Sequence, residues 1–104
     1  MKAYKLVVST AALSDIQEVT NWYNQCLPKL GTRFQQAVKK QISTLKYNAN
    51  SCAIRYQNVR CLLVKKFPYL IHFTINEVEE IVEVFAIIHT SRTPDIWEER
   101  NKLI

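Results

Sequence analysis

Two histidines are the residues of this 104-residue chain best suited to chemistry near neutral pH, because an imidazole exchanges its proton there. His89 ends a predicted strand and is followed by the turn-forming sequence Thr90-Ser91-Arg92. Its ring therefore either takes part in a site or bonds that turn. His72 lies in the middle of another predicted strand, where we expect it at the surface or partly packed.

Two arginines could bind a phosphate or a carboxylate, since a guanidinium presents a planar fork of donors. Arg60 is surrounded by apolar residues in a predicted strand, where an unpaired charge is costly to bury. It therefore either pairs with Glu83 across the sheet or meets a phosphate. Arg92 lies in a loop, a common place for functional residues, and alternatively pairs with Asp95 or Glu98.

Positive charge is concentrated in the middle of the chain. The net charge is +5, yet no acidic residue lies between Glu18 and Glu77. Residues 77–104, in contrast, hold seven acids and three bases. A basic stretch of this kind favours a polyanion or an acidic protein as partner over a merely solvated surface. Its nine cations are Lys29, Arg33, Lys39, Lys40, Lys46, Arg55, Arg60, Lys65 and Lys66.

The cysteines and the hydrophobic pattern exclude several classes of protein. Cys26, Cys52 and Cys61 are an odd number at wide spacing, which is typical neither of a disulfide framework nor of a zinc site. We therefore expect reduced, packed thiols, no metal and no cofactor. No apolar run approaches the roughly 20 residues that span a bilayer, and no secretion signal opens the chain. A cytoplasmic protein without a membrane partner is expected.

Two helices are predicted in the first half of the chain, after a short strand over residues 3–9. Ser9, Thr10 or Ser14 could cap the first helix. Its apolar stripe has helical spacing and comprises Ala12, Ile16, Val19, Tyr23 and Cys26. Pro28 ends this helix and opens the next, whose stripe comprises Leu30, Phe34, Val38, Ile42 and Leu45. Gly31 is expected to weaken the second helix slightly, and Trp22 to be a core anchor.

Strands are predicted in the second half of the chain. Residues 53–66 read as one strand with a possible kink near Gln57-Asn58, and residues 69–76 and 81–89 form a hairpin. Alternation puts His89 on one face of the last strand together with Glu83, Phe85 and Ile87, and puts Val82, Val84, Ala86 and Ile88 on the other. A short helix is expected over residues 95–100.

These elements predict a single α+β domain over residues 1–104. A pair of helices would cover one face of a mostly antiparallel sheet of three or four strands. The other face would be left partly bare, with His89 and Glu83 pointing toward it and cations around it. The position of the first strand, at an edge or beside the last strand, is left open.

Several segments resemble RelE/ParE toxins, and they follow one another in the family's order over nearly the whole chain. They are Ala12-Leu13-Ser14-Asp15-Ile16 with Trp22-Tyr23, Leu30-Gly31-Thr32-Arg33-Phe34, Arg55-Tyr56 with Val59-Arg60, Lys66-Phe67-Pro68-Tyr69-Leu70-Ile71, and residues 87–100. The resemblance implies the toxin of a type II toxin–antitoxin, or plasmid stabilisation, module, together with an antitoxin that wraps a helix-forming segment around it. No small-molecule ligand is expected.

The resemblance leaves two activities open. ParE-like toxins poison DNA gyrase without being hydrolases, whereas RelE-like toxins cut messenger RNA in the ribosome. For RNA cleavage, which needs a proton acceptor, a cation for the phosphate and a donor for the leaving oxygen, the candidates are His89, Arg60, Lys65 and Arg92. RelE-like toxins add a tyrosine near the carboxyl end, and this chain has none after Tyr69.

The missing tyrosine favours the gyrase inhibitor, which would not be an enzyme. A non-catalytic nucleic-acid-binding module is a further alternative, although no recognition motif for it is evident. In the gyrase reading the basic helices and the tail form the partner-binding surface, with Arg33, Lys40, Arg60, Lys65, Lys66, Arg92 and Trp97 as the candidate contacts.

Overall fold

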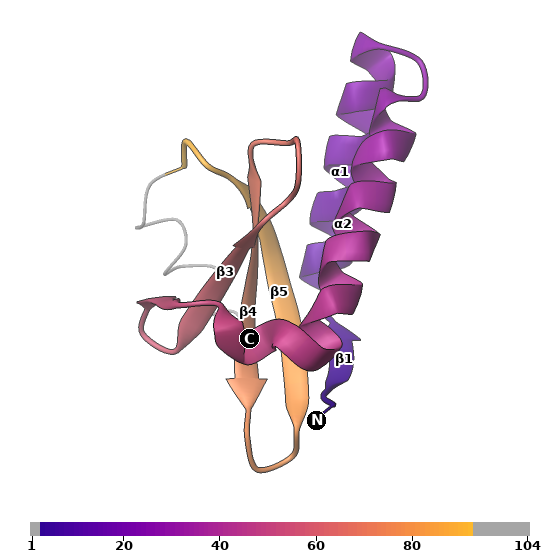
Figure 1. The fold of residues 1–104 in the computed structure, drawn as a ribbon. Coiled ribbons are helices and arrows are strands. Elements are labelled where there is room, and N and C mark those ends of the chain that lie inside the picture. The colour runs from indigo at the N-terminus through magenta and orange to yellow at the C-terminus, as the bar shows by residue number, and fades with distance from the viewer. Residues whose placement is uncertain (1–2, 93–104) are drawn as a thin grey trace.

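The computed structural model describes residues 3–92 as two helices packed on one side of a five-stranded sheet (Figure 1). This confirms the predicted α+β class. The predicted terminal helix and Trp97 lie outside the described residues. The elements are β1 (Lys5–Val8), α1 (Thr10–Cys26), α2 (Leu30–Asn48), a 3-10 turn (Ala49–Ser51), β2 (Ile54–Tyr56), β3 (Val59–Leu63), β4 (Tyr69–Asn76) and β5 (Ile81–His89).

The two helices form an antiparallel hairpin, as their sequence pattern predicts. Ser9 is the N-cap of α1, and its Oγ accepts from the Ala12 N–H at 3.1 Å. The stripe of α2 is buried through Phe34, Val38, Ile42 and Leu45, with Leu30 half-buried at its start. Trp22, however, is 56% exposed, so the expectation that it anchors the core is wrong.

Gly31 has a packing role that its helix propensity does not suggest. A Cβ at this position would collide with the Thr20 carbonyl oxygen of α1 and would lie 2.6 Å from Cγ of Asn24. The Gly31 N–H also donates to Oδ1 of Asn24 at 2.8 Å. The residue therefore lets the two helices approach closely where they meet.

The strand order in the sheet is β1-β5-β4-β3-β2. Every pairing is antiparallel except that of β1 with β5, so the first strand lies parallel beside the last one, at an edge. The sheet has five strands, not three or four, because residues 53–66 divide into β2 and β3 at the point where a kink was predicted. Gln57 adopts a positive φ of 47° there and closes a tight hairpin.

A β-bulge in β5 overturns the predicted alternation of this strand. His72 pairs with Ala86 but Phe73 pairs with Val84, so Phe85 is an extra residue. Up to Val84 the even-numbered residues face the helices, whereas after the bulge the odd-numbered ones do, because one inserted residue reverses the faces. The prediction that His89 points to the face away from the helices is therefore wrong.

That second face is not bare, which corrects a further expectation. Its buried apolar side chains are Val59, Leu70, Phe85, Ala86 and Ile88, and Tyr56 and Cys61 pack against them. His72 is fully buried here, not at the surface, and its Nδ1 lies 3.0 Å from the Tyr56 hydroxyl. A second small core thus occupies the face on which we expected a docking surface.

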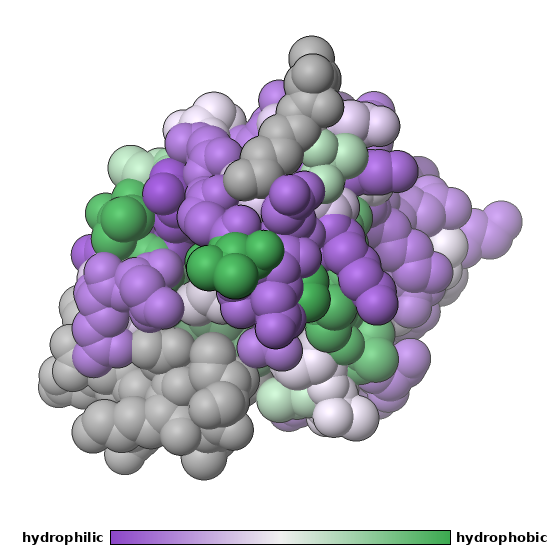
Figure 2. Space-filling view, turned by 90° about the horizontal axis from the view of Figure 1, so that it is seen from below, coloured by the Kyte–Doolittle hydropathy of each residue, from purple (hydrophilic) through white to green (hydrophobic). Residues whose placement is uncertain are grey.

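Figure 2 shows the molecule from below, with the described residues coloured by hydropathy. That view shows a mainly hydrophilic surface with small, separate hydrophobic patches. Within residues 3–92, no helix is both long enough and apolar enough to cross a membrane.

Candidate functional site

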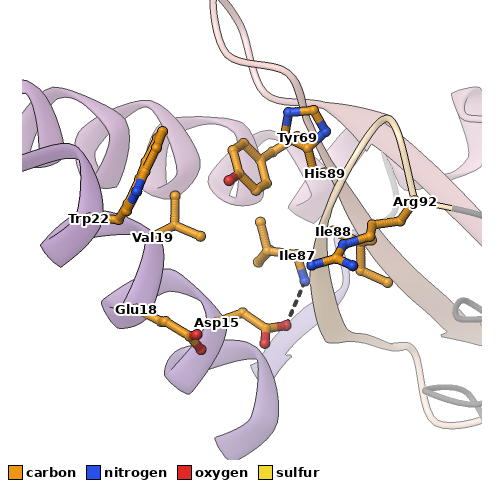
Figure 3. Close-up of a pocket in the computed structure, with 9 residues that line it drawn as sticks. All are labelled: Asp15, Glu18, Val19, Trp22, Tyr69, Ile87, Ile88, His89 and Arg92. Carbon is orange, nitrogen blue, oxygen red and sulfur yellow. Dashed lines mark hydrogen bonds between the residues drawn. The ribbon is translucent and has the colours of Figure 1, made fainter. Parts of the chain in front are cut away.

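A pocket of about 520 Å³ lies between α1 and the ends of β4 and β5 (Figure 3). It brings together side chains that are distant in sequence, because the bulge turns the end of β5 toward the helices. We call it the α1–β5 pocket. Its lining residues are Asp15, Glu18, Val19, Trp22, Tyr69, Ile87, Ile88, His89 and Arg92.

One face of α1 supplies the first wall of the pocket. Asp15, Glu18 and Trp22 are three and four residues apart, so they follow one another on one side of the helix. Oδ2 of Asp15 accepts from the Ile87 N–H at 3.0 Å. This amide faces the edge of β5 beyond the last pairing with β1, which is at Val84, so the carboxylate replaces a missing strand.

His89 bonds the turn that follows it and also lines the pocket. Its Nδ1 accepts from the Ser91 N–H at 3.0 Å and lies 2.8 Å from Ser91 Oγ. A backbone N–H can only donate, so Nδ1 is unprotonated and the neutral ring carries its proton on Nε2. In this arrangement His89 is a hydrogen-bond donor through Nε2. To act as a base it would have to break its bond with Ser91.

Tyr69 stands beside His89, with the two ring centroids 5.1 Å apart in an edge-on arrangement. Burial raises the pKa of the Tyr69 phenol, with nearby Glu18 adding to this effect and Arg92 opposing it. The phenol is therefore protonated at neutral pH. It offers the pocket a hydroxyl group and not a base.

Four of the predicted partner-binding cations meet in a second hollow, which we call the basic groove. Arg33 and Lys40 come from α2, and Lys65 and Lys66 come from the turn before β4. The groove measures about 760 Å³ and is completed by Leu30, Ala37, Gln41 and Phe67. Gln41 fixes α2 to the end of β3, since its Nε2 donates to the Leu63 carbonyl at 3.0 Å.

The cations of the basic groove are exposed, and no acid of residues 3–92 is among the side chains that line the groove. Arg33, Lys40, Lys65 and Lys66 are all exposed, and none forms an ion pair with an acid in the part of the chain that the structure describes. Apolar side chains such as Phe67 and Leu30 line the groove together with them. The groove can therefore accept negative charge and apolar contact together.

Arg60 lies apart from both hollows. Its guanidinium donates to the carbonyl oxygens of Cys52 at 2.6 Å and Asn50 at 3.2 Å, and so holds the 3-10 turn to β3. Within residues 3–92 its hydrogen-bond partners are thus these carbonyl oxygens, and not Glu83. The four ribonuclease candidates are divided among three places, with only His89 and Arg92 together.

Sequence reasoning did not include four polar or aromatic residues of the pocket among its candidate site residues, which are Asp15, Glu18, Trp22 and Tyr69. A signal for three of them was present. Asp15 and Glu18 are the only acids before Glu77, and they precede Trp22 at helical spacing. Tyr69 had no such signal, because its place beside His89 depends on the bulge.

Comparison with known families identifies the family of the chain. The model of the ParE toxin of type II toxin–antitoxin systems, parDE, matches residues 6–94. The chain belongs to this family. The match spans both helices, all five strands, the α1–β5 pocket and the basic groove, and it confirms the predicted RelE/ParE membership. No curated protein sequence matches the chain significantly.

Solved structures share the fold of this ParE-family toxin at low sequence identity. A chain of the chromosomal ParDE system from P. aeruginosa is 19% identical with a TM-score of 0.76, over 86% of this chain and 98% of that one. A mutant of the E. coli toxin RelE in the free state is 16% identical with a TM-score of 0.70, over 98% of each chain. The toxin–antitoxin complex RelBE2 from Mycobacterium tuberculosis contains a chain that is 15% identical with a TM-score of 0.62, over 84% of this chain and 98% of that one.

Proposed function

We propose that this toxin inhibits growth by binding DNA gyrase, that it acts by contact and not as a hydrolase, and that a cognate antitoxin neutralises it. The observation that carries the proposal is the separation of the ribonuclease candidates. Lys65 belongs to the basic groove, Arg60 is engaged by two carbonyl oxygens, and only His89 and Arg92 share a pocket. RNA cleavage needs these groups around one phosphate.

The chemistry of the α1–β5 pocket also supports a contact inhibitor. Asp15 and Glu18 place two carboxylates beside His89 and Arg92, and these would repel a phosphodiester. The Ser91 N–H donates to Nδ1 of His89, so this ring nitrogen already has a hydrogen-bond partner. Both features work against a phosphate-cleaving site.

The basic groove is the proposed docking place of the antitoxin. Its exposed cations and apolar residues match an acidic, amphipathic segment, which would gain charge complementarity and apolar burial together. Two of the similar structures are described as toxin–antitoxin complexes, one of them RelE with a peptide of its antitoxin. The pair would act in the cytoplasm as a plasmid stabilisation module.

The test is a supercoiling assay with purified gyrase and purified toxin, with and without the antitoxin. We expect loss of supercoiling and accumulation of cleaved DNA, both reversed by the antitoxin. In cells, induction without antitoxin should cause DNA damage before translation stops. Intact gyrase activity at a molar excess of toxin would overturn the proposal.

Messenger RNA cleavage is the second candidate, and one observation favours it. Tyr69, His89 and Arg92 share one pocket, so a phenol, an imidazole and a guanidinium are within reach of a common ligand. In this case induction would produce cleaved messages on ribosomes, and His89→Ala would abolish the cleavage. Under the gyrase proposal, neither the natural toxin nor the His89→Ala variant cleaves messenger RNA. Nucleic-acid binding without either inhibition would instead indicate a simple binding module.

A further inference from the structure

We infer that the α1–β5 pocket binds a single arginine side chain presented by the target protein. That this target is gyrase rests on the proposed function. That the pocket binds arginine is argued from its own side chains alone. The pocket lies on the side of the molecule formed by α1, and the cations of the basic groove are not among its lining residues. The toxin would thus recognise its target with a site that is separate from the groove proposed for the antitoxin.

An exposed carboxylate on the pocket lining favours a cation as ligand. Asp15 and Glu18 contribute two carboxylates to the lining, and Arg92 contributes one guanidinium. Asp15 already has partners, among them the Ile87 N–H, so the carboxylate that remains for a ligand is that of Glu18, which is exposed. These carboxylates are also the only acidic side chains in the first 76 residues of a chain whose net charge is +5.

Trp22 provides a flat, apolar wall on which a guanidinium can stack. The side chain is 56% exposed, yet it is not loose, because its ring packs against Tyr23 at 5.0 Å between centroids. In Figure 3 the indole stands edge-on at one side of the pocket, with Tyr69 and His89 across from it. An exposed tryptophan held in place in this way is typical of an interface hot spot, and its face attracts cations.

The remaining walls are fixed before any ligand arrives. The bond from the Ile87 N–H holds Asp15, and Tyr69 is braced by edge contacts with Tyr23, Phe34 and His89. Glu18 is one turn before Trp22, so a group stacked on the indole lies within reach of its carboxylate. A prearranged site loses little freedom on binding.

The geometry favours arginine over the other cations and over a nucleotide. A guanidinium can stack on Trp22 and at the same time donate two parallel bonds to the Glu18 carboxylate, whereas an ammonium cannot do both with a flat group. A nucleotide phosphate would face two carboxylates. The volume of about 520 Å³ exceeds what one side chain fills, which leaves room for the flanking backbone of a partner.

The test measures Trp22 fluorescence while a short peptide is added. The full chain carrying Trp97→Phe has Trp22 as its sole tryptophan. The probe is acetyl-Gly-Arg-Gly-amide, and the matched control is the same peptide with citrulline, which keeps the shape but loses the charge. We expect a saturable change with a Kd of about 1–10 mM for the arginine peptide, as for a ligand with few contacts, and none for citrulline.

Two isosteric variants separate the pocket from general charge effects. Glu18→Gln should weaken binding of the arginine peptide about tenfold, since it removes a charge-assisted pair of bonds. Glu79→Gln makes the same change of charge at an exposed position in the β4–β5 turn and should leave binding unchanged. Equal binding of the arginine and citrulline peptides, or an equal effect of the two variants, would overturn the inference, as would tighter binding of guanosine monophosphate.

The same pair of variants decides whether the arginine comes from gyrase. Glu18→Gln should raise the toxin concentration that half-inhibits supercoiling about tenfold, and Glu79→Gln should not. If Glu18→Gln loses the peptide but inhibits gyrase as well as the natural toxin, gyrase does not supply the arginine and the inference fails in that part. If the natural toxin leaves gyrase active, the proposed function fails, and the peptide titration still tests the pocket.

Discussion

At the scale of single residues, Asp15 shows how one side chain can create a site. It replaces the strand that β5 lacks beyond Val84 by accepting the Ile87 N–H at 3.0 Å. The same bond draws α1 against the end of the sheet, where the α1–β5 pocket forms. A carboxylate that appears in the sequence as an ordinary surface acid is therefore a structural acceptor.

Substitution of Asp15 should distinguish its acceptor role from its charge. Asp15→Ala leaves the buried Ile87 N–H without this partner and should lower the free energy of unfolding by about 1–3 kcal/mol. Asp15→Asn keeps an acceptor oxygen and should cost less than about 1 kcal/mol. Urea denaturation of both variants measures the difference. Equal losses would show that charge, and not the bond to Ile87, matters.

The cysteines also differ from one another at this scale. Burial raises the pKa of the Cys61 thiol to about 11, with nearby Arg55 opposing the shift, because the thiolate is penalised on the packed second face of the sheet. Burial likewise raises the pKa of Cys52, while Cys26 is exposed. Cys61 is thus a packing residue and not a reactive thiol.

Alkylation of the native protein should follow this order. With iodoacetamide at pH 8, Cys26 should react first and Cys61 last, since the thiolate is the reacting form. The rate at Cys61 should keep rising as the pH approaches 11, because its ionisation is displaced upward. Mass spectrometry of timed samples gives the three rates. Labelling of Cys61 as fast as that of Cys26 would contradict the burial argument.

At the scale of elements, two small features decide how helices and strands fit together. The extra residue Phe85 reverses the faces of the last part of β5 and brings His89 to the helices. Gly31 lets α2 approach the Thr20 carbonyl of α1. Each feature is local in sequence, but its effect appears only where two elements meet.

Replacement of Gly31 tests the close approach of the helices. Alanine is the better helix former by about 1 kcal/mol, so propensity alone predicts that Gly31→Ala stabilises the protein. Its Cβ would collide with the Thr20 carbonyl oxygen, which is backbone and cannot move away cheaply. We therefore expect a net loss of about 1–3 kcal/mol from overpacking.

Thermal or urea unfolding measures this loss. Gln36→Ala, at an exposed position of the same helix, is the control and should be neutral or slightly stabilising. A stable Gly31→Ala variant would mean that the helices can separate at this point without cost.

At the scale of the whole molecule, charge is distributed over two hollows of different character. The basic groove gathers Arg33, Lys40, Lys65 and Lys66, and the α1–β5 pocket holds the only acids that precede Glu77. A molecule with this pattern can bind an acidic antitoxin and a basic target group at different places. In that case the α1–β5 pocket would also be present while the antitoxin occupies the basic groove.

Neutralising the basic groove should weaken the antitoxin complex more than the same change elsewhere. The double variant Arg33→Gln/Lys65→Gln should raise the Kd about tenfold, with most of the change in the association rate at low salt. The control Lys5→Gln/Lys39→Gln removes the same charge at exposed positions outside the groove.

Titration with salt provides a second measure of the groove. Binding of the natural toxin should weaken as salt screens the groove, and the groove variant should be less sensitive. Calorimetry or surface plasmon resonance over a range of salt measures both effects. Equal Kd values for the two double variants would place the antitoxin elsewhere.

Periodicity and composition were sufficient for much of this protein. Local rules that act within a few residues predict the helical stripes around Phe34 and Val38, the break at Pro28 and the β4–β5 hairpin. The basic middle of the chain and the motifs of the ParE family can likewise be read directly from the sequence. Such rules do not predict the order of the strands or the bulge at Phe85. Nor do they predict which residues lie beside His89 in the pocket. Pairing joins residues that are far apart in the chain, and one extra residue in a strand exchanges its two faces without changing the composition around it. The sites therefore belong to the folded molecule, even though most of the elements that build them can be read along the chain.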